Sequence, residues 1–281
     1  MDGKIVRIIS NLYTVKVKDK LYDCRARGNF RIKNITPLVG DNVKVDVDKK
    51  LIIDILERKN ILTRPQVANV DCALIIASVK NPILDLNLLD KLITVVTYNK
   101  IEPVIIFTKL DLLDDLDNIS RLKDYYNNIG IKTFYNTEKR KILDYLQNKQ
   151  VVLAGQSGAG KSTLINNMIN QEIVKTDEIS KALGRGKHTT RHTELYQIEN
   201  VLIADTPGFS SLDLTTIKKE ELKNCFKEFN NYQCRFKDCL HNKEIDCKVK
   251  EAVLNKEIEK SRYDNYIKFL EGIKWRLEYL L

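Results

Sequence analysis

One stretch of the chain has the residue types and the spacing that bind a nucleoside triphosphate. Residues 155–163 read Gly-Gln-Ser-Gly-Ala-Gly-Lys-Ser-Thr and satisfy the pattern G-x-x-x-x-G-K-[ST]. Glycines let backbone N–H groups curve around phosphate oxygens without Cβ clashes. We expect the amine of Lys161 to reach the β- and γ-phosphates and the hydroxyl of Ser162 to ligate Mg²⁺. The predicted nucleotide contacts here are Gly155, Gln156, Ser157, Gly158, Ala159, Gly160, Lys161, Ser162 and Thr163.

A second motif indicates which base is bound. Thr108, Lys109, Leu110 and Asp111 fit the pattern [NT]-K-x-D, in which the aspartate accepts hydrogen bonds from N1 and N2 of guanine. Adenine offers no such pair of donors, so the motif predicts GTP and GDP as ligands. Thr108 stands where asparagine is commoner, so the contact of a side-chain amide is lost. The small backbone contact to guanine is expected near Tyr135-Asn136-Thr137, where Ser-Ser or Ser-Ala would be commoner.

A third motif, D-x-x-G, is met by Asp205-Thr206-Pro207-Gly208. We expect Asp205 to support the Mg²⁺ shell and the backbone of Gly208 to sense the γ-phosphate. Many GTPases place a water-orienting glutamine after this glycine, but here Phe209 follows, and a phenyl ring cannot orient water. Slow intrinsic hydrolysis is therefore predicted.

A separate cluster has the ligands of a metal ion. Cys234, Cys239, His241 and Cys247 offer three thiolates and one imidazole within 14 residues. This is a full Cys₃His set for tetrahedral zinc, and it predicts one structural Zn²⁺ because no coordination position stays open. The remaining cysteines, Cys24, Cys72 and Cys225, read as buried apolar residues.

Short strands fill the N-terminal region, and strands alternate with helices in the centre. Five strands within residues 1–65 predict a small OB-type barrel. From residue 70, nearly continuous apolar runs at 70–79, 103–107, 132–135, 150–154 and 201–204 alternate with helical stretches, which predicts a mostly parallel sheet covered on both faces. Residues 214–281 read as helical and charged. The predicted domains are 1–65, 66–213 and 214–281.

The order of the motifs is rotated. In ordinary GTPases the phosphate loop comes first, then D-x-x-G, then N-K-x-D. In this chain the T-K-x-D motif at 108–111 precedes the phosphate loop, and D-x-x-G comes last. Circular permutation is physically allowed because domain termini often lie close together. The segment after Gly208 then leads directly into the C-terminal region, so nucleotide state could act on that region.

Charge is unevenly distributed along the chain. The net charge is +9, of which residues 1–65 carry +7, whereas residues 66–213 carry −1. A basic flank beside a neutral enzyme core is consistent with binding to a nucleic-acid backbone, although a solubilising surface would look the same. No apolar run approaches the roughly 20 residues of a membrane helix, and no signal peptide precedes the first strand. We therefore expect a cytoplasmic protein with no membrane partner, and a monomer.

Taken together, these motifs resemble the circularly permuted small-ribosomal-subunit biogenesis GTPases called RsgA or YjeQ. The resemblance covers essentially the whole chain and includes Gly184-Arg185-Gly186-Lys187-His188-Thr189-Thr190, which is similar to the switch I signature GxGxHTT of that family. It implies a late maturation factor that binds the 30S ribosomal subunit and 16S rRNA near the decoding centre. It also implies GTP hydrolysis that is stimulated by the subunit and followed by release.

The same resemblance suggests the catalytic residues. Thr189 and Thr190 both qualify to complete the Mg²⁺ shell, and the sequence does not choose between them. His188 is the candidate for positioning water, with His192 as a weaker one. Two other functions stay open at this stage: an ATP-dependent kinase or ATPase that uses the phosphate loop alone, and an RNA-binding scaffold that holds nucleotide without hydrolysing it.

Overall fold

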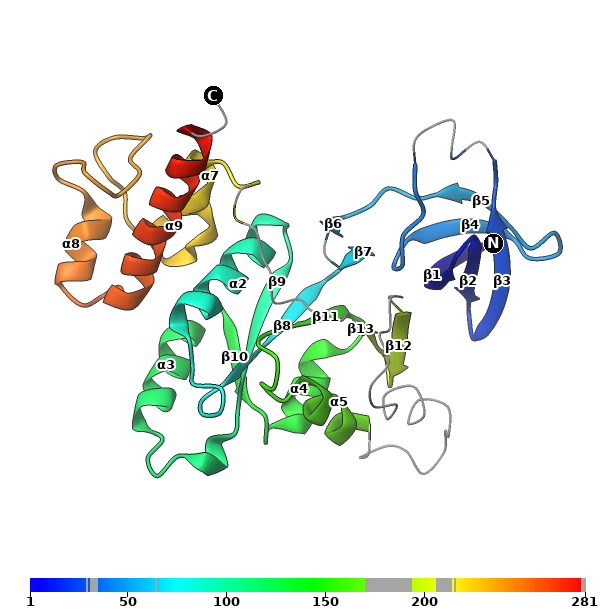
Figure 1. The fold of residues 1–281 in the computed structure, drawn as a ribbon, viewed down its shortest axis with the longest axis horizontal. Helices are drawn as coiled ribbons and strands as arrows, with labels where there is room; N and C mark the ends of the chain where they lie inside the picture. Colours follow the sequence, from blue (N-terminus) through cyan, green and yellow to red (C-terminus); the bar gives the residue numbers. More distant parts are fainter. Residues whose placement is uncertain are drawn as a thin grey trace.

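The computed structural model describes residues 1–28, 30, 35–63, 65–169, 194–205, 214 and 216–278. They form a barrel, a central sheet with helices on both faces, and a helical C-terminal segment (Figure 1). This architecture confirms the fold class predicted from the sequence. No helix within these ranges is long and apolar enough to cross a bilayer.

The barrel is built from five strands. They are β1 (Asp2–Ile9), β2 (Leu12–Val17), β3 (Lys20–Ala26), β4 (Asn42–Asp46) and β5 (Leu51–Ile55). Antiparallel pairs join β1 to β2, β2 to β3 and β4 to β5, while β1–β4 and β3–β5 pairs close the barrel. Inward-facing side chains such as Ile5, Val15 and Val43 form a separate apolar core.

The central sheet has the strand order β10-β9-β8-β11-β13-β12. The strands are β8 (Cys72–Ser78), β9 (Glu102–Thr108), β10 (Lys132–Tyr135), β11 (Gln150–Ala154), β12 (Glu194–Ile198) and β13 (Val201–Asp205). All neighbours are parallel except β12, which runs antiparallel to β13. The carboxyl ends of β9, β8, β11 and β13 therefore lie along one edge, where ligands bind in open α/β sheets.

Helices cover both faces of this sheet. Every residue of β8 is buried, as predicted for a strand between two layers. Its side chains point alternately to two cores: one is shared with α2 (Leu86–Tyr98) and α3 (Asp117–Asn128), the other with α4 (Lys139–Leu146) and α5 (Lys161–Ile169).

The sheet continues into the barrel, which the sequence did not predict. Strand β12 pairs with β1 in register Arg7 to Glu194, so the eleven strands from β10 to β4 form one sheet. Between the barrel and β8, a small hairpin of β6 (Ile61–Thr63) and β7 (Gln66–Ala68) was also missed. Three-residue strands are too short to show a hydrophobic period.

The C-terminal segment packs on α2. It contains α7 (Lys219–Leu222), the 3₁₀ turns η2 (Lys223–Cys225) and η3 (Lys227–Asn231), and the helices α8 (Lys248–Leu254) and α9 (Lys260–Glu278). Its buried apolar side chains, among them Phe226, Phe229 and Tyr266, belong to the same core as those of α2 and α3. The segment and the central domain thus share one core.

Candidate nucleotide and metal sites

The phosphate loop lies between β11 and α5 and has the backbone that its glycines allow. Gly155, Gly158 and Gly160 all have positive φ, at 132°, 75° and 99°. A Cβ at Gly155 would lie only 2.3 Å from the carbonyl oxygen of Ile76, so no other residue fits there. The glycines that the motif predicted are thus required by this loop conformation.

Lys161 already folds back over this loop. Its ammonium group donates to the carbonyl oxygens of Gly155, at 2.8 Å, and of Gln156, at 2.7 Å. Burial lowers the pKa of this amine. Phosphate oxygens would replace these carbonyls as acceptors. Ser162 and Thr163 lie exposed in the first turn of α5, where a hydroxyl is accessible to a metal ion.

The T-K-x-D motif lies beside the phosphate loop. Thr108 is the last residue of β9, and its buried hydroxyl donates to the carbonyl oxygen of Ala159 at 2.7 Å. At the position where asparagine is commoner, the hydroxyl of Thr108 thus makes a direct contact to the phosphate loop. Lys109 follows in the left-handed conformation, with φ of 62°, and Asp111 lies exposed in η1 (Leu110–Leu112).

A loop that the sequence reading missed holds this motif. The residues after β8 contact the motif twice: the N–H of Val79 donates to the carbonyl of Thr108 at 3.1 Å, and Lys109 donates to the carbonyl of Asn81. Lys80 also donates to the carbonyl of Leu112, directly after the motif, at 2.9 Å. We call residues 78–82 the cradle loop. Its only sequence signal was a Lys-Asn-Pro turn directly after a buried strand.

The carboxyl end of β10 completes this edge of the sheet. The N–H of Asn136 donates to the carbonyl of Phe107 at 2.9 Å, so residues 135–137 lie next to the end of β9. Glu138 fixes the turn, because it accepts from the N–H of Tyr135 at 2.8 Å and from Lys123 at 2.6 Å. Although burial alone would raise the pKa of Glu138, its hydrogen bonds with Lys123, Tyr135 and Lys141 lower it to about 2.

The remaining predicted residues are only partly described. Asp205 ends β13, directly beside β11, so its backbone reaches the same sheet edge. Its side chain lies outside the described residues, and so do Gly208, Phe209, His188, Thr189 and Thr190, together with His192. Their roles stay predictions.

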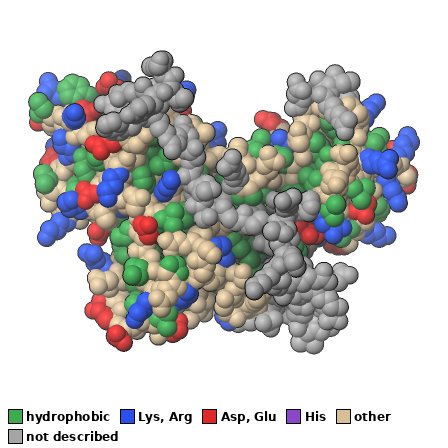
Figure 2. Space-filling model, in the orientation of Figure 1, with side chains coloured by type: hydrophobic (Ala, Val, Ile, Leu, Met, Phe, Trp, Pro, Cys, Tyr) green, Lys and Arg blue, Asp and Glu red, His purple; other side chains and the backbone are tan. Residues whose placement is uncertain are grey.

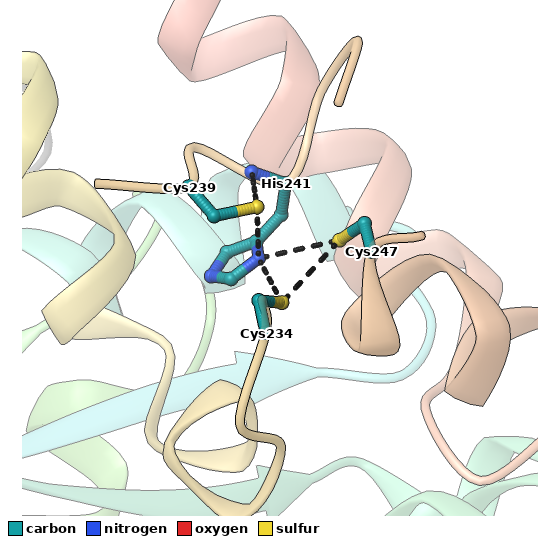
Figure 3. A group of neighbouring side chains, drawn as sticks. All are labelled: Cys234, Cys239, His241 and Cys247. Carbon is teal, nitrogen blue, oxygen red and sulfur yellow. Dashed lines mark hydrogen bonds between the residues drawn. The ribbon is translucent and has the colours of Figure 1, made fainter. Parts of the chain in front are cut away.

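The four predicted metal ligands converge (Figure 3). Nδ1 of His241 lies 3.5, 3.4 and 3.4 Å from the Sγ atoms of Cys234, Cys239 and Cys247, and the Sγ atoms of Cys234 and Cys247 are 3.8 Å apart. Tetrahedral zinc, with Zn–S of about 2.3 Å and Zn–N of about 2.0 Å, requires S···S near 3.8 Å and N···S near 3.5 Å. The ligand set therefore fits zinc in both chemistry and size.

Neighbouring groups orient these ligands. Tyr263 donates to the carbonyl of His241 at 2.8 Å, and Tyr266 donates to the carbonyl of Leu240 at 2.6 Å. Glu244 accepts from the N–H groups of Leu240 and Asn242, both at 2.8 Å. Such outer contacts fix the ligand loop. As predicted, Cys24, Cys72 and Cys225 are buried, and none of them forms a disulfide.

Comparison with known proteins gives consistent matches. The sequence matches the family described as RsgA GTPase over residues 55–215 and the RsgA N-terminal domain over residues 2–51. It is 44% identical to a Clostridium perfringens protein called small ribosomal subunit biogenesis GTPase RsgA, covering 97% of this chain and 98% of that protein. A Listeria monocytogenes protein with the name RsgA 1 is 43% identical, covering 98% of both chains.

Two solved structures are similar over nearly the whole chain. The crystal structure of YjeQ from Thermotoga maritima has a TM-score of 0.84 and 34% identity, covering 97% of this chain and 98% of that chain. The crystal structure of YloQ, described as a circularly permuted GTPase, has a TM-score of 0.84 and 38% identity, covering 98% and 95%.

Proposed function

This chain belongs to the RsgA GTPase family, whose members hydrolyse GTP, and on that basis we propose that it is a late maturation factor of the 30S ribosomal subunit. The subunit stimulates its GTPase, and hydrolysis to GDP and phosphate drives its release. The main support for a GTPase is the hydrogen bond from the hydroxyl of Thr108 to the carbonyl of Ala159. This bond joins the base-recognition motif to the phosphate loop.

The site residues divide into base, phosphate and metal contacts. Asp111 would accept from N1 and N2 of guanine. Lys161 and the N–H groups of the phosphate loop hold the phosphates. Ser162 and Asp205 would hold Mg²⁺, whose charge would offset that of the phosphate oxygens. Gly208 senses the γ-phosphate.

Water is positioned by a residue of switch I. We assign this role to His188, because Phe209 cannot orient water, while Thr189 or Thr190 completes the metal shell. Intrinsic turnover is consequently slow, and contact with the subunit accelerates it.

The barrel contacts 16S rRNA. Its Lys and Arg side chains gather on the outer surface at the right of Figure 2, and residues 1–65 carry most of the net charge of the chain. OB barrels bind single-stranded RNA through basic grooves. Residues 1–65, 66–213 and 214–281 then serve as the RNA-binding, GTPase and zinc-binding domains of a cytoplasmic monomer with one structural Zn²⁺.

Sedimentation with purified 30S subunits tests the proposal. We expect co-sedimentation with a non-hydrolysable GTP analogue, loss of co-sedimentation with GDP, and faster GTP hydrolysis when subunits are added. Equal binding in both nucleotide states, or no stimulation, would contradict it. Equal affinity for ATP and GTP would favour an ATPase instead.

A further inference from the structure

A buried charged cluster joins the C-terminal segment to the GTPase domain. Arg262 of α9 is 1% exposed and donates from Nε and Nη2 to the two carboxylate oxygens of Glu228, at 2.8 and 3.1 Å. Its Nη1 donates to Asp90 of α2 at 2.7 Å. Asp90 also accepts from Tyr126 of α3 at 3.0 Å and from Asn265 of α9 at 2.6 Å. Such a network holds its members in one arrangement, because each lost partner leaves a buried polar group unpaired.

The same helix also contacts the beginning of α2. Asn265 donates to the carbonyl of Leu86 at 3.2 Å and accepts from the side chain of Asn87 at 2.8 Å. Leu86 is the first residue of α2, and Asp85 before it caps the helix by accepting from the N–H groups of Asn87 and Leu88. Helix α9 therefore holds the first two turns of α2.

The segment that enters α2 begins with the cradle loop. Only residues 83–85 separate this loop from the first turn of α2. On its other side the cradle loop contacts Thr108, Lys109 and Leu112, which surround Asp111. A continuous series of hydrogen bonds and backbone thus leads from α9 to the base-recognition motif.

We infer that Arg262 and Asn265 are positioning residues for guanine recognition, acting through the start of α2 and the cradle loop on Asp111. This inference rests on the proposed role of Asp111. It also means that the C-terminal segment moves with the GTPase domain as one body. By linkage, a partner that displaces α9 changes the affinity for guanine nucleotides by the same factor as the nucleotide changes affinity for that partner.

The test compares GDP with inosine diphosphate (IDP), whose base lacks the 2-amino group that Asp111 recognises. The ratio of the two affinities reports the placement of Asp111, whereas a general loss of stability leaves it unchanged. Both affinities are measured by competition against a fluorescent GDP on the full-length chain, at a temperature where circular dichroism shows every variant folded.

Two variants act at opposite ends of the route. We expect Asn265→Ala and Lys80→Met each to lower the GDP-to-IDP preference about fivefold, near the lower end of typical coupling. The double variant should lower the GDP-to-IDP preference no further than the single variant with the larger effect, because both changes act through the cradle loop. If Asn265→Ala does not fold, Asn87→Ala replaces it in the test. That change removes only the hydrogen bond from the partly exposed side chain of Asn87 to Asn265.

The matched control is Arg121→Gln. It removes an exposed ion pair with Glu259, 3.6 Å long, between α3 and the residue before α9, and should leave the preference unchanged. An unchanged preference in Asn265→Ala or Asn87→Ala, or multiplying effects in the double variant, overturns the inference. If the unaltered protein shows no preference for GDP over IDP, the proposed function itself fails instead.

Discussion

The GTPase domain meets its two neighbours in different ways. The barrel has its own apolar core and adds only a few apolar residues, such as Val6 and Val39, to the core of the GTPase domain. Polar contacts also join the two, such as Lys4 with Gln150 at 2.9 Å. The C-terminal segment has no separate core among the described residues, and its buried side chains complete that of the GTPase domain. The difference indicates that the barrel depends less on the GTPase domain for its fold than the C-terminal segment does.

Removal of the proposed zinc ion should give the largest effect on stability. Cys239→Ser, or a strong chelator, should lower stability by more than about 5 kcal/mol, because metal binding energy is folding energy in a segment this small. Since the core is shared, the C-terminal segment and the GTPase domain should lose stability together. Calorimetry of the full-length chain measures this, and a GTPase transition unaffected by chelation would contradict the comparison.

Arg262→Met should give the second largest loss of stability. It leaves the carboxylates of Asp90 and Glu228 buried without a cation, which costs about 3–5 kcal/mol. Urea unfolding measures the loss. The exposed pair removed by Arg121→Gln should change stability by less than about 0.5 kcal/mol. Similar values for the two variants would mean that the buried cluster does not hold the segment.

On the barrel side, Gly40→Ala should cost about 2 kcal/mol. Gly40 has φ of 90°, and a Cβ there would lie 2.1 Å from the carbonyl oxygen of Ala68, next to the central sheet. We expect faster amide exchange in the barrel and at its junction with the sheet, with protection of β8 unchanged. If exchange in β8 rises equally, the barrel is not independent.

Thr108→Val should weaken GDP binding about tenfold, the equivalent of one buried hydrogen bond of about 1.4 kcal/mol. The valine removes the donor to Ala159 and leaves that carbonyl without its partner. Thr108→Ser keeps the hydroxyl and should bind normally. Isothermal titration measures both, and equal affinities would show that the two motifs need no direct contact.

The smallest expected effect is the loss of stability at acidic pH that is due to Glu138. The pKa of Glu138 is lowered to about 2 in the folded protein from 4.5, so its contribution is complete above about pH 4.5 and is lost as the pH falls toward 2. Because the group is partly solvated, we expect about 1 kcal/mol. Glu138→Gln should flatten the difference in stability between pH 5 and pH 3. If stability depends on pH in the same way in the variant, Glu138 is not the cause of the acid sensitivity.

Local signals in the sequence predicted much of the fold. The bounds of β10 and β11 match those expected, and the metal ligands converge, because apolar runs and short ligand spacings depend on nearby residues. The pairing of β12 with β1 joins segments far apart in the chain and has no local signal.

The charged cluster was missed for the same reason. Arg262 lies in a stretch that reads as helical and charged, and its partner Asp90 is 172 positions away. A single arginine carries no mark of burial, so only the three-dimensional structure shows it. The cradle loop likewise gained its role from contacts with β9, which no pattern in residues 78–82 encodes.

Strand β1 covers the outer edge of β12. A shortened chain that begins after the barrel would open the edge of β12 at Glu194, where it pairs with Arg7, and open strand edges recruit strands from other molecules. The barrel therefore also limits the sheet edge that the GTPase domain exposes to other molecules.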